Sequence, residues 1–352
     1  MSLRNYRLIA SVVLLFCGCS AAGHFLDYNE FSEADEALKV KSLKLRIEKC
    51  IYVNNIGLRL VKHFPRLSEG LYGNLGMLVS SLDKNMAVIF DRIDDEDKAI
   101  VYGLLKGSPA EKAGLKVGDV IFKINQMYVT SYNFGSVIAN LKQDNPCRIE
   151  VLRKGDIASF EVNIGKIAHS VNFLIVDSQE VNAASFPGGV AITYGLLNFI
   201  KSDDELAIVL SHELAHFIKG HFLETKGSDL IPAILAQQLG KSADVSLDSE
   251  LGKLLKLSFS SKVSFDLERE ADFLGMLLAH KSGFDIDKGI YIWERLVVEL
   301  PQGIETYFLL NHPMSSKRLF KLKKIAEDLK SSSLKMKDYF NPSQNSPDLK
   351  PE

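Results

Sequence analysis

The chain has 352 residues, which is enough for two or three domains with buried cores and excludes a mini-protein held together by cysteines. Apolar residues make up 46% of the chain and charged residues 24%, as in ordinary globular proteins. The 42 basic and 44 acidic side chains give a formal charge of −2, without the strong positive excess that is typical of nucleic-acid-binding domains. We therefore expect no nucleic-acid partner.

The first 18 residues are predicted to be an export signal, because two arginines precede an apolar run that is too short to span a bilayer. The following Gly18 and Cys19 resemble the lipobox of bacterial lipoproteins, in which the cysteine is lipidated and becomes the new N-terminus. Lipidation of Cys19 is the favoured prediction. Cleavage by an ordinary signal peptidase after Ala22 is the alternative.

This resemblance implies a protein of the bacterial cell envelope that faces the periplasm and is attached to a membrane through a lipid on Cys19. Ser20, directly after Cys19, is compatible with sorting to the outer membrane. An oxidising compartment would permit Cys50 and Cys147 to pair. Because one lies in a helical pattern and the other in a strand pattern of a separate module, we expect no disulfide between them and two buried thiols instead.

In chain order, a polar tether at residues 19–34 precedes a helical pattern over residues 36–63, which Pro65 ends. Residues 70–165 then change to short β-branched runs separated by turn residues. The strands predicted in this region are 86–93, 99–105, 120–125, 148–153 and 159–164. Further strands are expected at 172–177 and 190–193, helices from residue 203 onward, and a flexible polar tail at 331–352.

The sequence His-Glu-Leu-Ala-His at residues 212–216 is the pattern that places two imidazoles one turn apart on one helix face. A capping box at residues 202–205 begins this helix. His212 and His216 can then bind one divalent cation. Glu213, about 100° around the helix, is placed to take a proton from a water molecule on that cation. The pattern predicts a catalytic site with one zinc ion per chain, against the alternative of a solvated helix with two incidental histidines.

A third ligand is expected on another element, because a catalytic zinc keeps three protein ligands and one open position. Glu268 and Asp272 lie four residues apart and share one face of a segment with helical period. Taken alone, such a pair is more often a solvated acidic edge than a metal site. In a chain that also contains the two paired histidines, it becomes the predicted source of the third ligand.

At this point the chain resembles the gluzincin-type zinc endopeptidases that include the heat-shock protease of bacterial inner membranes, the prenyl-protein endopeptidase and the β-barrel assembly-enhancing protease. Their signature, His-Glu-x-x-His followed by Glu-x-x-x-Asp, is matched by residues 212–216 and 268–272. Residues 180–207 look like the segment that precedes the metal helix in that family. Residues 311–318 look like its downstream His-Pro element.

The resemblance implies that His212, His216 and Glu268 ligate zinc. It also implies that Glu213 acts as general base and then as proton donor to the leaving amine. Asp272 would accept the second N–H of a ligand histidine and fix its tautomer.

Further expectations concern the cleft beside the metal. His312 is expected to stabilise the oxyanion of the tetrahedral intermediate, unless it only caps a turn, and Arg318 to orient Asp272 or that histidine. A strand with a free edge is expected to pair with an extended substrate through Gly189, Val190 and Ala191. Such pairing would favour unfolded chains as substrates.

Residues 107–121 are similar to the central signature of bacterial PDZ domains, with a short helix that Gly114 closes. The second helix of the peptide groove is expected at residues 133–142. The loop that contains Leu75, Gly76 and Met77 resembles the one whose N–H groups receive a terminal carboxylate, with an ordinary turn as the alternative.

The predicted fold class is α+β, with a mainly helical gluzincin-type metallopeptidase domain that contains a small β-sheet and is interrupted by a β-rich PDZ domain. The metallopeptidase domain is assigned to residues 35–66 and 166–330 and the PDZ domain to residues 67–165. Residues 224–261 are expected to form two amphipathic helices, or else a mobile cover of the site.

The predicted function is zinc-dependent hydrolysis of peptide bonds in misfolded or unassembled envelope proteins, with the PDZ domain recruiting or regulating polypeptide substrates. One alternative is a non-catalytic PDZ adaptor with a structural metal site, against which the intact Glu213 argues. Another is a cytoplasmic protease whose apolar N-terminus is accidental. The sequence predicts no particular oligomeric state.

Overall fold

The computed structural model describes residues 28–63, 75–141, 145–164, 171–186, 188–221, 245–246, 248–249, 252–253, 255–256, 264–300 and 312–331. The chain divides into two compact units, Met1–Ser42 and Leu43–Glu352. The predicted export signal, Cys19, most of residues 224–261 and all but the first residue of the predicted tail lie outside the described residues. Among the described helices, none has the length and apolar character that crossing a bilayer requires.

Helix α1 (Tyr28–Lys62) begins inside the segment that was expected to be a polar tether, so this part of the prediction is wrong. Residues 28–34 contain neither proline nor glycine, and acidic side chains such as Glu30 and Glu33 stabilise the first turns of a helix. The later part of the helix is buried at Val53 and Leu60. It therefore belongs to the core of the second unit.

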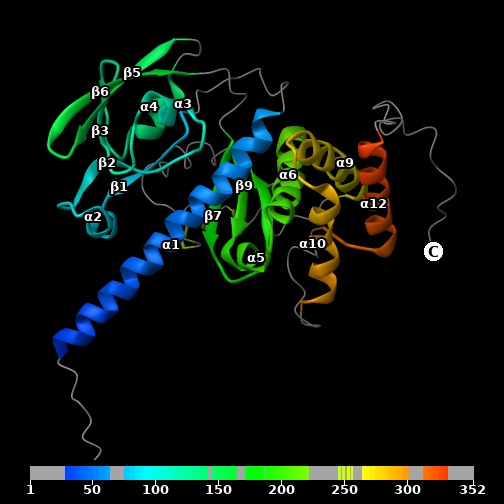
Figure 1. Cartoon of the computed structure of the whole chain (residues 1–352). Helices are drawn as coiled ribbons and strands as arrows, with labels where there is room; N and C mark the ends of the chain where they lie inside the picture. Colours follow the sequence, from blue (N-terminus) through cyan, green and yellow to red (C-terminus); the bar gives the residue numbers. More distant parts are fainter. Residues whose placement is uncertain are drawn as a thin grey trace, which may run out of the picture. The chain divides into compact units, whose positions relative to one another are not determined.

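Six strands between residues 77 and 163 form an antiparallel sheet in the order β1-β2-β3-β5-β6, with β4 beside β3 (Figure 1). The strands are β1 (Met77–Leu82), β2 (Asp95–Leu104), β3 (Val120–Ile124), β4 (Met127–Tyr128), β5 (Pro146–Arg153) and β6 (Asp156–Asn163). Three short helices accompany them: α2 (Lys84–Phe90), α3 (Pro109–Ala113) and α4 (Phe134–Ala139). Apolar side chains from this sheet, α3 and α4 form a core of their own.

The predicted strand at residues 86–93 is wrong, because α2 occupies most of it. The side chain of Asp83 accepts a hydrogen bond from the backbone N–H of Met86, and Asp91 ends the helix with a φ of 50°. A short apolar run looks the same in a buried helix and a buried strand, so its periodicity could not decide between them. The other four strands expected here correspond to β2, β3, β5 and β6. The short helix closed by Gly114, with a φ of 94°, is also present.

A second sheet has the order β10-β7-β9-β8 and is followed by helices. Its strands are β7 (Asn172–Asp177), β8 (Ala183–Phe186), β9 (Gly189–Thr193) and β10 (Val245–Ser246). β7 is parallel to both β9 and β10, whereas β8 is antiparallel to β9. The helices are α5 (Tyr194–Phe199), α6 (Asp203–Lys219), α9 (Phe265–Lys281), α10 (Ile286–Val298) and α12 (Ser316–Lys330). The α+β class expected from the sequence is confirmed.

The expected free edge at Gly189, Val190 and Ala191 is a third error. These residues lie in β9, which is hydrogen-bonded to β7 on one side and to β8 on the other, so both of its edges are occupied. Among the described strands, β8 and β10 end this sheet. An all-apolar strand is typical of the interior of a sheet, and all five residues of β9 are buried.

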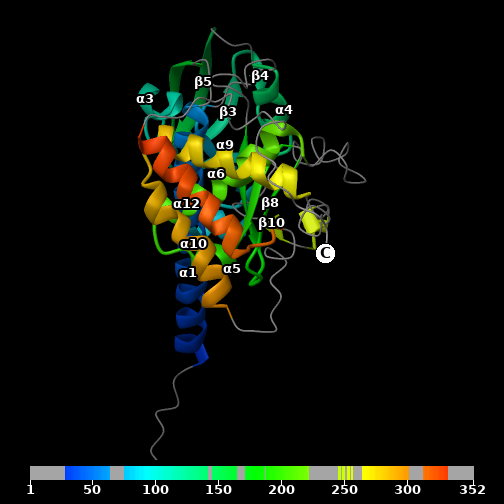
Figure 2. The same cartoon turned by 90° about the vertical axis from the view of Figure 1, so that its right-hand side faces the viewer.

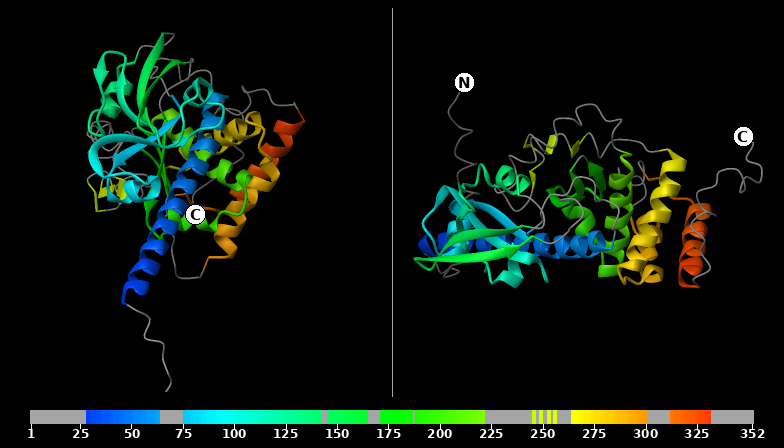
Figure 3. Two further views of the ribbon diagram at one scale, coloured as in Figure 1. Left: turned by 60° about the vertical axis from the view of Figure 1, so that its left-hand side comes forward. Right: turned by 90° about the horizontal axis from the view of Figure 1, so that it is seen from above.

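Helix α6 lies at the centre of the helical part, with α9, α10, β8 and β9 packed against it (Figures 2 and 3). Every residue from Glu205 to His216 is buried, which is typical of a helix surrounded by protein. The crossing with α9 is close at Gly275, where an added Cβ would lie 2.9 Å from both Cα and N of His212. This close approach brings α9 alongside the histidines of α6.

Cys50 and Cys147 are both buried and form no disulfide, as the sequence predicted. Cys50 lies in the apolar cluster that includes α1, and Cys147 in the core of the six-stranded sheet. Burial raises the pKa of the Cys147 thiol to about 11. This thiol therefore packs as a small apolar group.

Candidate metal centre

Helix α6, which carries His212 and His216, is capped at both ends by residues directly next to it in the sequence. Ser202 is the N-cap, and its side chain accepts a hydrogen bond from the N–H of Glu205 at 3.1 Å. Gly220 is the C-cap in a left-handed conformation, with a φ of 70°. Between these caps, His212, Glu213 and His216 are each at most 2% exposed.

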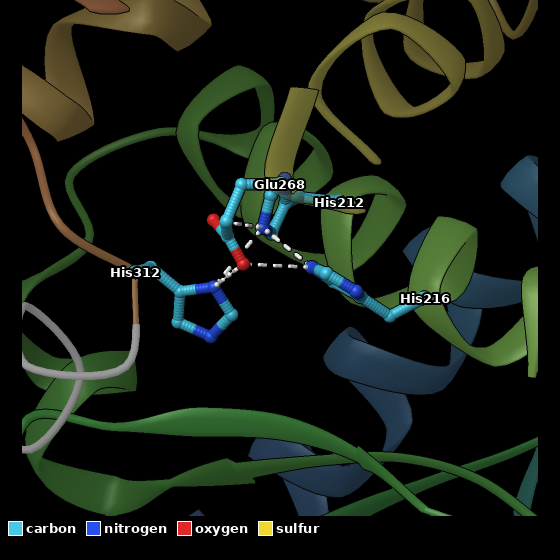
Figure 4. Close-up of side chains that lie close together, drawn as sticks. All are labelled: His212, His216, Glu268 and His312. Atoms are coloured by element: carbon cyan, nitrogen blue, oxygen red, sulfur yellow. Dashed lines mark hydrogen bonds and ion pairs between the residues drawn. The ribbon is translucent and has the colours of Figure 1, made fainter. Parts of the chain in front are cut away.

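Four side chains from three parts of the chain converge beside α6 (Figure 4). His212 and His216 come from α6, Glu268 from the first turn of α9, and His312 from the segment before α12. Nε2 of His212 lies 3.1 Å from Nε2 of His216, and Oε1 of Glu268 lies 3.2 Å from Nε2 of His216. Nδ1 of His312 lies 2.9 Å from the same Oε1. One donor atom from each residue thus falls within 4.8 Å of the others.

This arrangement fits a zinc ion. Zinc prefers imidazole nitrogen and carboxylate oxygen at about 2.0–2.1 Å in a tetrahedron, whose edges are then about 3.3 Å long. Two separations are close to that edge length: 3.1 Å between the Nε2 atoms of His212 and His216, and 3.2 Å between Nε2 of His216 and Oε1 of Glu268. The other oxygen of Glu268, Oε2, lies 3.5 Å from Nε2 of His212. Buried lone pairs packed this closely repel one another unless a cation or protons lie between them. The predicted ligands His212, His216 and Glu268 are therefore together in the fold.

The predicted catalytic residues Glu213 and His312 lie next to each other at this cluster. Oε1 of Glu213 is 3.3 Å from Nε2 of His312. The carboxylate of Glu213 is 1% exposed and is not one of the four converging donors. His312 presents its other nitrogen to Glu268, so it lies between the predicted base and the predicted third ligand.

Asp272 and Arg318, predicted to support the ligands, are also at the site. Oδ1 of Asp272 is 3.2 Å from Nδ1 of His212, the nitrogen that faces away from the cluster. Arg318 donates to both oxygens of Asp272 at 2.8 Å, through Nε and one terminal nitrogen. The same terminal nitrogen lies 2.8 Å from Oε2 of Glu268. Arg318 thus holds the carboxylates of Asp272 and Glu268 together.

The two histidines of α6 have very different pKa values in the metal-free protein. Burial disfavours a charged His212, yet hydrogen bonds to Asp272 and Glu268 and their negative charge raise its pKa to about 10. Burial lowers the pKa of His216 to about 4, with only partial opposition from its hydrogen bond to Glu268. Burial also opposes ionisation of Glu268, but the neighbouring histidines hold its pKa well below the usual value.

A group of residues that the sequence did not point to completes the surroundings of His216. Nδ1 of His216 lies 2.8 Å from Nδ1 of His221, whose Nε2 lies 3.3 Å from Oε2 of Glu270. The ammonium of Lys219 pairs with the other oxygen of Glu270. The available signal was a histidine directly after the glycine that ends the metal helix.

The residues predicted for peptide binding lie apart from the cluster in sequence, at two sheets. Leu75 is buried, Gly76 has a φ of 71°, and Met77 begins β1, which is the end strand of its sheet in the described part. An added Cβ on Gly76 would lie 2.1 Å from Cβ of Ser108, so only glycine fits there. The residues Gly189, Val190 and Ala191 are inside the other sheet, as described above.

Residues 157–326 match the model of peptidase family M48, and residues 73–164 match that of the PDZ domain. The mitochondrial metalloendopeptidase OMA1 of Arabidopsis thaliana is 35% identical over 147 residues, which are 41% of this chain and 29% of that protein. The protein of that name from Schizosaccharomyces pombe is 34% identical over 154 residues, or 42% and 44% of the two chains. A probable periplasmic serine endoprotease, DegP-like, of Pseudomonas putida is 31% identical over 96 residues, or 27% and 20%. The chain spans less than half the length of these curated relatives.

Proposed function

We propose that this chain, which belongs to peptidase family M48 and carries a PDZ domain, is a zinc endopeptidase of the bacterial cell envelope. Its substrates are misfolded or unassembled polypeptides, and the PDZ domain recruits them or regulates their cleavage. The metallopeptidase domain comprises residues 35–66 and 166–330, interrupted by the PDZ domain at residues 67–165.

The buried carboxylate of Glu213 is the observation that carries this proposal. A structural zinc site closes its coordination with side chains and has no use for a base beside it. Here a fifth ionisable side chain, 1% exposed, contacts His312 at 3.3 Å without being one of the four converging donors. Burying a carboxylate costs free energy, and a general base beside the metal gives this one a chemical role. This favours a hydrolase over a PDZ adaptor with a structural metal.

The residues divide the work of peptide hydrolysis. When bound, zinc supplies a Lewis acid that polarises the scissile carbonyl and brings water to a pKa near 7. Glu213 accepts the proton of the attacking water and later delivers a proton to the leaving amine. His312 donates an N–H to the oxyanion of the tetrahedral intermediate. Asp272 fixes the tautomer of His212, and Arg318 orients Asp272.

The substrate backbone lies along β8 (Ala183–Phe186) rather than β9. β8 is an end strand of the described sheet and packs against α6, the helix that bears the two histidines. The adjacent Asn182 is fully buried, and its Nδ2 has no partner among the described residues. An extended peptide can add to such an edge through main-chain hydrogen bonds. This mode of binding requires an unfolded stretch of substrate.

The PDZ domain takes substrate tails beside β1, at the loop that contains Leu75, Gly76 and Met77. Tethered binding of this kind raises the local concentration of substrate without adding contacts at the metal. The similar DegP-like protein is named as periplasmic, which supports a location on the periplasmic side of the envelope.

The chain is held at a membrane, in our proposal the outer membrane, by a lipid on Cys19. Metabolic labelling with a radioactive fatty acid tests this part. The wild-type chain should carry label and fractionate with membranes, whereas Cys19→Ser should do neither. A labelled Cys19→Ser protein, or an unlabelled wild-type protein, would contradict the anchor without affecting the proposed hydrolysis.

The substitution Glu213→Gln tests the proposed activity. Full-length protein in detergent should retain one zinc per chain by elemental analysis, while casein cleavage falls at least about 100-fold, the usual contribution of a general base. Glu299→Gln, at the exposed C-cap of α10, is the matched control and should cleave normally. Undiminished cleavage by Glu213→Gln would refute the mechanism. A wild-type protein that binds zinc and PDZ ligands but cleaves nothing would favour the adaptor.

A further inference from the structure

We propose that His221 and Glu270 are positioning residues for the metal site. The imidazole of His221 accepts the Nδ1–H of His216 and donates its own Nε2–H to Glu270, which keeps Nε2 of His216 directed at the metal. This inference rests on the proposed function only in requiring that His216 is a zinc ligand.

The tautomers follow from which atoms face each other. Nε2 of His216 faces His212 and Glu268, so it must carry the lone pair that binds a metal. The proton of a neutral His216 is then on Nδ1, which lies 2.8 Å from Nδ1 of His221. His221 can accept that proton's hydrogen bond only if its own proton is on Nε2. Nε2 of His221 lies 3.3 Å from Oε2 of Glu270, an acceptor, so the chain of hydrogen bonds is complete.

The backbone places His221 by a helix C-cap. Gly220 donates its N–H to the carbonyl of Phe217 at 3.1 Å, and His221 donates its N–H to the carbonyl of His216 at 3.0 Å. Together with the left-handed Gly220, these two bonds define a Schellman motif, in which the residue after the glycine contacts the residue five positions earlier. That contact is usually between apolar side chains. Here both members are histidines, and their rings lie 5.0 Å apart between centroids.

His212, the other predicted ligand histidine, has a different partner for its Nδ1. Nδ1 of His212 meets the carboxylate of Asp272 directly, and Arg318 holds that carboxylate. Nδ1 of His216 meets a carboxylate only through His221, and Lys219 pairs with that carboxylate. Both ligands therefore have the outer partner that metal-binding histidines generally need. The side chain of His221 is 6% exposed, so water has little access to replace it.

The test compares two substitutions of His221 in full-length protein, with zinc affinity measured by competition with a chelator. His221→Leu removes the acceptor and should weaken zinc binding about 10- to 100-fold. His221→Asn places an amide oxygen near the position of Nδ1 and should restore zinc binding to within about threefold of wild type. His63→Leu, an exposed histidine at the end of α1, is the control and should bind zinc normally.

A second readout separates positioning from simple packing. The visible spectrum of the cobalt-substituted protein reports the ligands and their geometry, so it should change in His221→Leu and return in His221→Asn. Wild-type zinc affinity in His221→Leu, or failure of His221→Asn to restore affinity and spectrum, would overturn the proposal.

The same variants distinguish this inference from the proposed function. Casein cleavage by the wild type together with unchanged zinc affinity in His221→Leu would overturn the positioning role and leave the hydrolase intact. In the opposite case, the wild type cleaves nothing, but zinc affinity falls in His221→Leu and returns in His221→Asn. This result would overturn the hydrolase and support the positioning role.

Discussion

His212 and His216 are neighbours on one helix face, yet their surroundings give them opposite protonation in the metal-free protein. Asp272 and Glu268 raise the pKa of His212 to about 10 despite its burial, whereas burial lowers the pKa of His216 to about 4. Both imidazoles must be neutral to bind a metal. Zinc therefore displaces a proton from His212 but none from His216 at neutral pH.

This difference predicts how zinc affinity depends on pH. Because the pKa of His212 is raised, its proton competes with zinc throughout the range from pH 6 to 8. Affinity should fall about tenfold for each unit that the pH decreases. Calorimetric titration in two buffers with different ionisation enthalpies should show at least about one proton released per zinc at pH 7, that of His212, with a further fraction from water on the zinc. Zinc binding without proton release would contradict the assigned charge of His212.

Arg318 is the cation that keeps two buried carboxylates together. Burial opposes ionisation of Asp272, but Arg318 and His212 hold its pKa below the usual value. Arg318→Ala should destabilise the metal-free protein by about 3 kcal/mol, because removing one partner leaves a buried charge without compensation. Lys323→Ala breaks an exposed pair with Glu294 and should cost less than about 1 kcal/mol. Urea denaturation in the presence of EDTA measures both, and equal losses would contradict this role.

At the scale of elements, the site depends on how closely α9 crosses α6. Gly275 makes that approach possible, since an added Cβ would lie 2.9 Å from the backbone of His212 and 3.0 Å from that of Ser211. Backbone atoms cannot rotate away as the end of a side chain can. The spacing of the two helices, and with it the distance from Glu268 to the histidines, is fixed at this glycine.

Gly275→Ala should therefore push α9 away from α6, weaken zinc binding at least about tenfold and lower stability by about 1–3 kcal/mol. Gly289→Ala is the matched control, because its Cβ would clash with Ile208 and Asp204 where α10 meets α6, away from the histidines. That variant should lose stability and keep most of its zinc affinity. Chelator competition and urea denaturation measure the two effects. Wild-type zinc affinity in Gly275→Ala would show that the crossing does not set the site.

At the scale of the whole molecule, the PDZ sheet and the helical part share apolar core. Ile100 and Tyr102 of β2 belong to the same buried cluster as Ile47 and Cys50 of α1. Lys106, two residues after the end of β2, also donates its backbone N–H to the side-chain oxygen of Asn55 in α1 at 2.9 Å. Elements that share a core unfold together. The two parts of the second unit should therefore behave as one cooperative body.

Gly103→Val tests this coupling, because a Cβ on Gly103 would lie 2.7 Å from Ile51 of α1 and 3.2 Å from Leu78 of β1. Scanning calorimetry should show one main transition in the wild type and two in Gly103→Val, with zinc content unchanged. Ile157→Ala, at an exposed position of β6, should leave the single transition in place. Two independent transitions in the wild type would contradict the shared core.

The sequence by itself determined the features that depend on local spacing. His212 and His216 are four residues apart, so any helix brings them together, and the caps at Ser202 and Gly220 ensure that helix. The PDZ signature around Gly114 is local in the same sense. A known family pattern then pointed to Glu268, which is 52 residues beyond His216.

Only the tertiary structure decided which faces meet. It brought Glu268, His312 and Arg318 to the same histidines, placed β9 inside its sheet and left β8 at the end of the described part of that sheet. It also folded His221 back onto His216. Such contacts join elements far apart in the chain or depend on the turn after a helix, and they are settled by packing. Residue spacing determines which side chains share one face of a helix or strand. Which helices and strands then pack against each other depends on the burial of their apolar faces.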